Sequence, residues 1–475
     1  MTKRKTIFLT VLILAAVALN LAAALIPFRL SHPDVSGSGV TEISEGTRTL
    51  LDGIGRDAEI IYYADSPDAD LRTFLSRYGT AHVSVKVKKP AAPADDQTIL
   101  IRSGERSRTF GLEELYCYIS ATTGEILSLT EYAQISAYLS QLDSGSDSYQ
   151  MLMYYYGPDV LQAYFMGEPL VSAALRNLTS DTGYRTIYVP VLNTGDGADW
   201  YVSLRLEQYG FLPVRVSALS DVPAGATVWL SPTADLSGEQ AEELKRFLSD
   251  GGQLFLTTSY QNTDLPNLAS VLSEYGLSTS PAQNLVTDKV TTTSGSTLSA
   301  VFDGVRSEHA INEASGASFK AVYAHQINVS SVERVENAGL LRTSFSGGYT
   351  EKTEEGEDPV SESGTFYFAA SAIRGESRVV WLGMQLSAMT DSYSGGGNSA
   401  YAAACFAWLG RQDADPLPGA IGQAREIPSA LLNVKMSTFT TWIVIFVVLI
   451  PLALLAVALV LRYVRNKRTQ PEALQ

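Results

Sequence analysis

The sequence has few of the residues that most often build catalytic or metal centres. Only two cysteines, Cys117 and Cys405, occur among its 475 residues. Two thiols so far apart form neither a disulfide framework nor a zinc site, so we expect each to be a small buried hydrophobe, with one disulfide as the alternative. The four histidines lack metal-ligand spacing, which argues against a zinc centre. They are His32, His82, His309 and His325.

Several motifs of well-known enzyme classes are also missing. There is no GxxxxGK(S/T) phosphate loop, because the stretch 347–353 lacks the spacing and has acidic neighbours. There is no GxSxG elbow and no HExxH, which argues against an α/β-hydrolase and a zinc protease. Acidic residues such as Asp199 and Glu207 are numerous, but no pair stands out, and we interpret them as turn or helix-surface residues. We therefore predict no catalytic residue, no cofactor and no metal.

The chain is also poor in positive charge. It has 35 Lys and Arg against 50 Asp and Glu, which gives a net charge of −15. Such an acidic surface argues against a nucleic-acid partner, because phosphate contacts need clustered cations. It also argues against a protein that lies flat on anionic lipid.

Two long uncharged apolar runs stand near the ends of the chain. Thr6–Ile26 and Phe439–Leu461 are each long enough to span the roughly 30 Å hydrocarbon core of a bilayer as a helix. Pro451 in the second run is tolerated in a membrane helix. The alternative for the first run is a cleaved signal peptide, but it is longer than the usual apolar region of one. We predict two transmembrane helices.

The basic residues beside these runs predict their orientation. Cytoplasmic flanks carry an excess of Lys and Arg, so both ends of the chain should be cytoplasmic and everything between the runs extracytoplasmic. Trp442 lies near the outer end of the second run, where interfacial aromatics gather. The flanking residues are Lys3, Arg4, Lys5, Arg462, Arg465, Lys467 and Arg468. The sequence thus predicts a two-pass protein of a bacterial plasma membrane.

Between the runs, alternating helix and strand patterns predict α/β domains. In the clearest unit, strand 226–230 is followed by a capping box at Ser237 and Gln240, a helix, a left-handed cap at Gly251 and strand 254–257. This unit predicts a parallel, Rossmann-like sheet. We expect a cytoplasmic tail at 1–5, membrane helices at 6–26 and 439–461, an N-terminal α/β domain at 40–148, a second α/β domain at 149–412, a linker at 413–438 and a cytoplasmic tail at 462–475.

Three polar stretches between these elements are expected to be loops. Asp143–Ser148 is interpreted as the boundary of the two domains. The acidic stretch 351–363 has no apolar pattern and is predicted to be a mobile loop. Glycine-rich segments can bind anions through their backbone amides, so two of them are candidate ligand or partner loops. Their residues are Asn193 and Gly195, and Gly395, Gly396, Gly397 and Asn398. The simpler interpretation of the second segment is a turn before a helix capped by Asn398 or Ser399.

Four stretches in this order resemble one family: Ile43–Tyr78, Phe165–Leu178, Asp235–Asp288 and Arg378–Leu409. With the two flanking apolar runs, they are similar to the GldG-like auxiliary proteins of ABC transporters, known from gliding-motility transport systems. The resemblance covers most of the region between the runs. Many relatives have a Gly-His pair where this chain has Asn193, Thr194 and Gly195, so any role of that histidine does not carry over.

The resemblance implies a fold and a set of partners. The family's middle domain is similar to the glutamine-amidotransferase fold, whose enzymes need a nucleophilic cysteine after a central strand. Here Ser231 and Pro232 follow that strand. The resemblance therefore implies a non-enzymatic subunit that works with a separate ATPase and permease in the lipid bilayer. The alternatives are a membrane-anchored sensor or envelope-binding protein, and a degenerate hydrolase that would need an acid beside a serine or histidine in a deep cleft.

Overall fold

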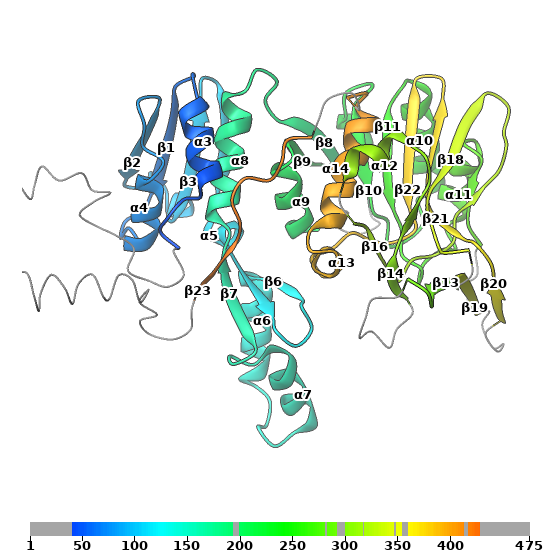
Figure 1. Cartoon of the computed structure of the whole chain (residues 1–475), viewed down its shortest axis with the longest axis horizontal. Coiled ribbons are helices and arrows are strands. Elements are labelled where there is room, and N and C mark those ends of the chain that lie inside the picture. The colour runs from blue at the N-terminus through cyan, green and yellow to red at the C-terminus, as the bar shows by residue number, and fades with distance from the viewer. Residues whose placement is uncertain are drawn as a thin grey trace, which may run out of the picture.

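We describe the fold from a computed structural model. It describes residues 40–192, 199–280, 283–291, 300–316, 318–345, 348–353, 360–412 and 417–427. Across these ranges no helix is long and apolar enough to cross a membrane. The two predicted spans, their basic flanks and Trp442 all lie outside the described residues. The described part is a mixed α/β protein with parallel and antiparallel sheets (Figure 1).

The first unit contains two four-stranded sheets. In the first sheet, in the order β2-β1-β3-β4, β1 is parallel to β2 and antiparallel to β3. The second sheet has the order β23-β7-β5-β6 and is antiparallel. The strands are β1 (Ala58–Tyr63), β2 (Val83–Lys88), β3 (Thr98–Ser103), β4 (Arg106–Phe110), β5 (Tyr116–Ser120), β6 (Ile126–Ser128), β7 (Leu161–Phe165) and β23 (Arg425–Ile427).

Local signals in the sequence fix the helices of this unit. Ser44 caps the first of them by accepting a hydrogen bond from the backbone amide of Thr47, as its position in the sequence predicts. Leu51 on the buried face of the same helix packs into the core. The helices are α3 (Glu45–Gly53), α4 (Ala69–Ser76), α5 (Leu112–Leu115), α6 (Leu129–Leu139), α7 (Asp147–Tyr156) and α8 (Gly167–Thr179).

The hydrophobic core of the first unit extends beyond the predicted boundary at residue 148. One cluster of buried side chains is built mainly from residues between Ile43 and Leu178, and α8 contributes Leu170, Ala174 and Leu175 to it. Leu204 and Ala388 of the second unit also join this cluster. The polar stretch predicted to separate the domains is instead the turn of a helical hairpin, where Ser146 caps α7. The change of core lies after α8, because α8 packs its buried side chains against β3 and β4 of the first sheet.

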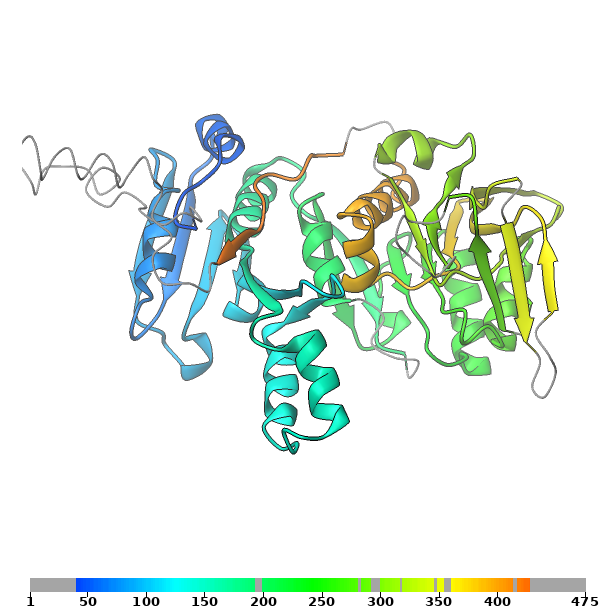
Figure 2. The same cartoon turned by 60° about the horizontal axis from the view of Figure 1, so that its bottom comes forward.

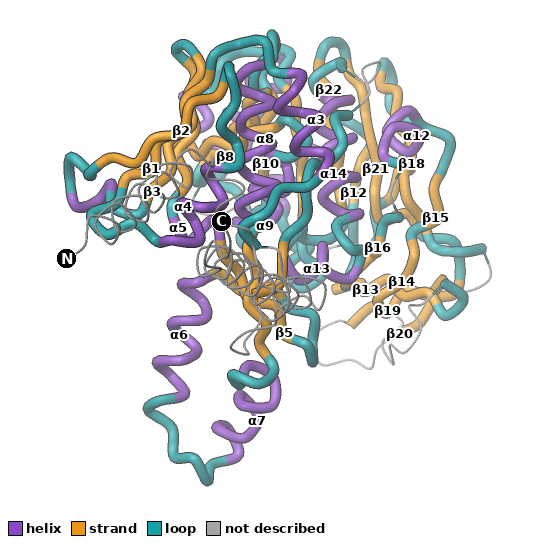
Figure 3. The backbone as a smooth tube through the Cα atoms, turned by 60° about the vertical axis from the view of Figure 1, so that its left-hand side comes forward, coloured by secondary structure: helices purple, strands orange, loops and turns teal. Residues whose placement is uncertain are grey.

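The hairpin of α6 and α7 stands away from the rest of the molecule (Figures 2 and 3). None of its helical residues is buried. Four large apolar or aromatic side chains on it are exposed: Tyr138, Met151, Tyr154 and Tyr155.

The second unit is built on an eight-stranded sheet with the order β15-β18-β21-β22-β11-β10-β8-β9. Its five strands from β9 to β22 are parallel, and in chain order they follow the doubly wound pattern 2-1-3-4-5. The strands are β8 (Arg185–Pro190), β9 (Phe211–Val216), β10 (Thr227–Leu230), β11 (Gln253–Thr257), β15 (Val305–Arg306), β18 (Val335–Arg342), β21 (Tyr367–Arg374) and β22 (Ser377–Leu382). The parallel sheet predicted from 226–257 is confirmed.

Helices cover both faces of this sheet. Successive side chains of each strand point to opposite faces, so each strand contributes to two cores. Along β10, Trp229 packs with α9 and α14, whereas Val228 and Leu230 pack with α10 and α11. The capping box of Ser237 and Gln240 forms as predicted. The helices are α9 (Trp200–Glu207), α10 (Gly238–Ser249), α11 (Pro266–Ser273), α12 (Ala310–Ser315), α13 (Ala388–Tyr393) and α14 (Gly397–Leu409). Figure 1 shows α9 and α14 between the two units.

The long connection from β11 to β22 adds short strands, and it corrects the prediction of a loop at 351–363. Residues 351–353 belong to β19, which pairs with β13 and β20, and residues 360–363 form β20. Residues 354–359 lie outside the described part. Charge did not prevent strand formation, because β19 and β20 are held by the backbone hydrogen bonds of the β13-β19-β20 ladder, which do not depend on apolar side chains. The added strands are β12 (Leu277–Ser278), β13 (Gln283–Asp288), β14 (Val301–Asp303), β16 (Lys320–Val322), β17 (Asn328–Val329), β19 (Gly348–Thr353) and β20 (Val360–Ser363).

After α14 the chain returns to the first unit, where β23 adds to β7 (Figure 2). There Glu168, which is 1% exposed, joins the two ends of the described chain. Its Oε1 accepts hydrogen bonds from the backbone amide of Ser44 and, at 2.7 Å, from the Thr47 hydroxyl. Its Oε2 accepts one from the guanidinium of Arg425, also at 2.7 Å. We name Ser44, Thr47, Glu168 and Arg425 the terminal junction.

Candidate functional site

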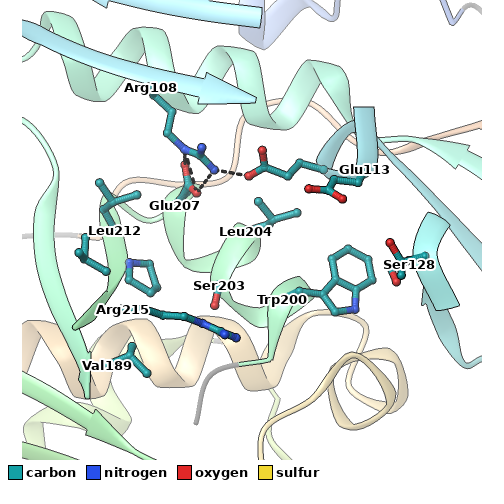
Figure 4. A pocket seen from close by; sticks show the side chains of 14 residues that line it. Arg108, Glu113, Ser128, Val189, Trp200, Ser203, Leu204, Glu207, Leu212 and Arg215 are labelled. Atoms are coloured by element: carbon teal, nitrogen blue, oxygen red, sulfur yellow. Dashed lines mark hydrogen bonds and ion pairs between the residues drawn. The ribbon is translucent and has the colours of Figure 1, made fainter. Parts of the chain in front are cut away.

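A cleft of about 610 Å³ lies between the two units (Figure 4). The first unit lines one wall of this inter-unit cleft with polar side chains, among them Arg108, Glu113 and Ser128. The second unit lines the other wall with side chains of α9 and β9, among them Trp200 and Arg215. Since clefts between domains are common ligand and partner sites, this is the first candidate.

A buried ion cluster closes one side of the inter-unit cleft. Arg108 on β4 donates to both carboxylate oxygens of Glu207, with Nη2 2.8 Å from Oε1 and Nε 3.0 Å from Oε2 (Figure 4). Arg108 also pairs with Glu114 on α5, and the Tyr184 hydroxyl donates to Glu207. Such a fork joins the two units with fixed geometry.

Burial and pairing act in opposite directions on this cluster. Burial favours neutral Arg108, but hydrogen bonds and the negative charges of Glu207 and Glu114 outweigh it and raise the pKa of Arg108. Burial likewise raises the pKa of Glu207, and the hydrogen bonds from Arg108 oppose that rise. Both oxygens of Glu207 are thus engaged in holding the units together, so Glu207 serves as a structural anion rather than as a free acid or base.

The other acid singled out by the sequence is also structural. Asp199 caps α9 through hydrogen bonds from the backbone amides of Tyr201 and Val202. Burial raises the pKa of its carboxyl, and these amides oppose the rise. An Ncap carboxylate of this kind stabilises its helix by about 1 kcal/mol.

Backbone conformation, close packing and hydrogen bonds fix the glycine-rich segment at the start of α14. Gly395 and Gly396 have φ angles of +61° and +91°, which favour glycine. A Cβ on Gly397 would lie 2.0 Å from the carbonyl oxygen of Ser318, so that close approach requires glycine. Asn398 is buried, and its side chain bonds to the backbone amide and carbonyl of Lys320 and to the carbonyl of Thr390.

The structure therefore corrects the predicted cap of this helix. Gly396, and neither Asn398 nor Ser399, is the N-cap of α14. The amide of Asn398 ties the helix to β16 and α13 instead. The other candidate loop residues, Asn193 and Gly195, lie outside the described residues.

The cysteines and the other possible metal ligands complete the survey of chemistry-bearing residues. Cys117 and Cys405 are buried free thiols, as expected for small hydrophobes. Within the described ranges, no group of three or more His, Cys, Asp or Glu side chains is arranged to hold a metal ion.

A second cleft, of about 420 Å³, lies at the carboxyl ends of β11 and β22. We name it the strand-end cleft. The rings of Tyr260 and Tyr323 stack there, with centroids 5.8 Å apart and planes 21° from parallel. Tyr323 has a φ of +51°. The lining residues are Ser259, Tyr260, Gln261, Val322, Tyr323, Gln385, Ser387, Met389 and Thr390.

Buried polar contacts fix the backbone beside this cleft. The Nε2 of His325 accepts a hydrogen bond of 2.7 Å from Thr258, whose hydroxyl accepts one of 2.7 Å from the indole of Trp381. The Nδ1–H of His325 donates to the carbonyl of Gln326. At the end of β22, a Cβ on Gly383 would lie 2.5 Å from the carbonyl oxygen of His325, so glycine lets the two segments meet.

Sequence reasoning missed both clefts. Each is formed by segments far apart in the chain, such as Arg108 and Glu207, which are 99 residues apart. The one available signal for the strand-end cleft was position, since Ser259 to Gln261 directly follow a strand of a predicted parallel sheet.

No family model matches the sequence, and no curated protein is significantly similar to it. Among solved structures, the mmIFT52 N-terminal domain is similar over 47% of this chain and 96% of that domain, with 16% identity and a TM-score of 0.34. The carbohydrate deacetylase Agd3 covers 46% of this chain at 10% identity, with a TM-score of 0.23. A beta-galactosidase from Rahnella sp. R3 covers 48% at 9% identity, with a TM-score of 0.26. The chain spans 32% of each of these two enzymes.

Proposed function

We propose that this protein is a non-enzymatic auxiliary subunit of an ABC-type transport system. Two membrane helices anchor it in a bacterial plasma membrane, and residues 40–427 form an extracytoplasmic region that contacts substrate or partner. The ATPase and the permease are separate chains. The proposal includes an amidotransferase-like fold of the second unit, supported by its doubly wound strand order. Ser231 follows the central strand where such enzymes need a cysteine, which supports the non-enzymatic role.

The terminal junction is the observation that carries this proposal. If a membrane helix anchors each end of a domain, the two ends of the chain should leave the folded domain close to each other. Glu168 binds Ser44 near the first described residue and Arg425 near the last. Eleven residues lie between residue 427 and the second apolar run at Phe439, a short tether of at most about 40 Å. The folded region can therefore stay close to a bilayer that both helices enter.

The state of Glu207 in the inter-unit cleft, and of Asp199 beside it at the start of α9, supports a binding role. Glu207 uses both carboxylate oxygens on Arg108, and Asp199 caps α9. Side chains already saturated by structural partners suit a rigid contact surface better than proton transfer.

Purification of the full chain from its native membranes tests the proposal. In mild detergent we expect an ATP-binding subunit and a polytopic permease to co-purify, identified by mass spectrometry. A reporter fused after Gln475 should be active in the cytoplasm. Recovery of the chain without any ATP-binding subunit would refute the transporter role, and a reporter active outside the membrane would refute the topology.

A second candidate function is favoured by the strand-end cleft. A pocket at the carboxyl ends of parallel strands is the usual ligand site of open α/β sheets. The alternative is therefore a membrane-anchored protein that binds an envelope component or a small molecule. It predicts ligand binding by the purified chain with no transporter subunit present, which the experiment below measures.

A further inference from the structure

We propose that the strand-end cleft binds a neutral saccharide. The inference does not depend on the transporter role, since it concerns binding by this cleft alone. Its volume of about 420 Å³ lies within the range of small-molecule sites. Segments that follow β11 and β22 form its walls, so the rigid sheet positions the lining side chains.

The absence of charge among the nine lining residues selects the class of ligand. Phosphates and carboxylates are bound by Arg, Lys or clustered backbone amides, and none of the nine side chains is ionic. The Thr390 hydroxyl is used in the cap of α13, where it donates to the carbonyl of Ser387 and accepts from its amide. The other lining side chains offer amides, from Gln261 and Gln385, and hydroxyls, from Ser259 and Ser387. Each of these groups can both donate and accept, which matches the hydroxyl groups of a sugar, since these also do both.

The tyrosine pair supplies the apolar half of a sugar site. Centroids 5.8 Å apart leave no room for a ligand ring between Tyr260 and Tyr323, because each contact needs about 3.5 Å. A ligand therefore lies on an outer face of the pair. Aromatic faces carry negative charge density and attract the weakly positive C–H groups of a pyranose ring. Both tyrosines are half-buried, so one side of the pair is held by protein and part of it stays accessible.

The backbone at Tyr323 shows strain at the same position. A φ of +51° is unfavourable for a bulky side chain and costs about 1 kcal/mol or more. The surrounding structure enforces it: the Tyr323 amide donates to the carbonyl of Ala300, and the next residues pair across Gly383. Strain of this kind recurs at ligand sites, and here it turns the Tyr323 ring toward Tyr260.

Ligand-observed NMR on the full chain tests the proposal. The detergent must lack a sugar headgroup, for example lauryldimethylamine oxide, because a maltoside would compete. The probes are maltotriose, cellotriose and chitotriose, with trigalacturonic acid as the anionic comparison. We expect saturation transfer to at least one neutral trisaccharide and a weaker signal for the acid.

Variants assign the binding to the cleft. Tyr260→Ala should raise the Kd about tenfold through loss of stacking, whereas Tyr260→Phe keeps the ring and should change it by less than about threefold. Met389→Trp fills the cleft from an exposed position and should abolish binding without unfolding the protein. Tyr154→Ala, on the exposed hairpin, is the matched control and should leave the Kd unchanged.

Three results would overturn the proposal. They are no saturation transfer to any neutral trisaccharide, equal or stronger binding of trigalacturonic acid, and unchanged affinity in both Tyr260→Ala and Met389→Trp. Thermal unfolding of each variant establishes that it is folded, and if Tyr260→Ala fails to fold, the Met389→Trp result decides.

Discussion

The buried imidazole of His325 should make the stability of this protein depend on pH in a predictable window. The ring is fully buried, and burial lowers its pKa to about 4, while the hydrogen bond to the Gln326 carbonyl opposes the shift. Protonation at Nε2 would also turn an acceptor into a donor that faces the Thr258 hydroxyl. The folded protein therefore requires neutral His325.

The size of the effect follows from the difference between the two states. An unfolded histidine titrates near 6.5 and the folded one near 4, so the full penalty is about 3 kcal/mol. Above pH 6.5 the ring is neutral in both the folded and the unfolded state, so His325 does not lower the free energy of unfolding. Between pH 6.5 and 4 the unfolded state binds the extra proton, so stability falls as pH falls, by about 2 kcal/mol at pH 5.

Urea unfolding of the full chain in detergent, from pH 7.5 to 4.5, measures this dependence. His325→Gln should remove about 2 kcal/mol of the difference between pH 7.5 and pH 5. His82→Gln, which alters a half-exposed histidine, is the control and should keep it. Acids such as Glu168 also make the free energy of unfolding depend on pH at low pH. The test is therefore the difference in pH dependence between wild type and each variant. An identical pH slope in wild type and His325→Gln would refute the reasoning.

Three further substitutions test other parts of the structure. Arg108→Ala leaves Glu207 buried without its cation and should destabilise the protein by about 3–5 kcal/mol in urea unfolding. Glu168→Gln weakens both arms of the terminal junction, and we expect a loss of about 2–4 kcal/mol and faster proteolysis near Arg425. Gly383→Ala places a methyl group against a carbonyl and should cost about 2 kcal/mol in thermal unfolding.

Matched controls separate these effects from a general loss of charge or flexibility. Arg334→Ala and Glu45→Gln alter exposed members of surface ion pairs and should change stability by less than about 0.5 kcal/mol. Gly225→Ala tests a glycine with open space around it, where only the positive φ is strained. If Arg108→Ala or Glu168→Gln were as mild as its control, the corresponding buried pair would not hold the fold as described.

The sequence predicted the elements whose signals are local. The cap at Ser237 and the left-handed Gly251 form as predicted, because each depends on a few neighbouring residues. The parallel pairing of β10 and β11 followed from an apolar strand on either side of one amphipathic helix.

The features that define the candidate sites depend on contacts between distant parts of the chain. Glu168 and Arg425 are 257 residues apart, and a glutamate in an otherwise ordinary helix carries no sign of its partner. The domain boundary was wrong for a related reason. The polar turn 143–148 between α6 and α7 resembles a linker in composition, although the chain then returns to the same core. The acidic stretch 351–363 was wrongly predicted to be a loop, because its strands are held by backbone pairing with β13 and with each other, which the side chains do not reveal.

The return of β23 to the first unit has a mechanical consequence. The chain enters the second unit after α8 and leaves it after α14, so the eight-stranded sheet is an insertion within the first unit. Tension between the two ends of the described chain is therefore carried by the short β7–β23 ladder and by Glu168, and it bypasses the inserted sheet. The inserted sheet is therefore shielded from that tension, while the Arg108–Glu207 fork holds the second unit against the first.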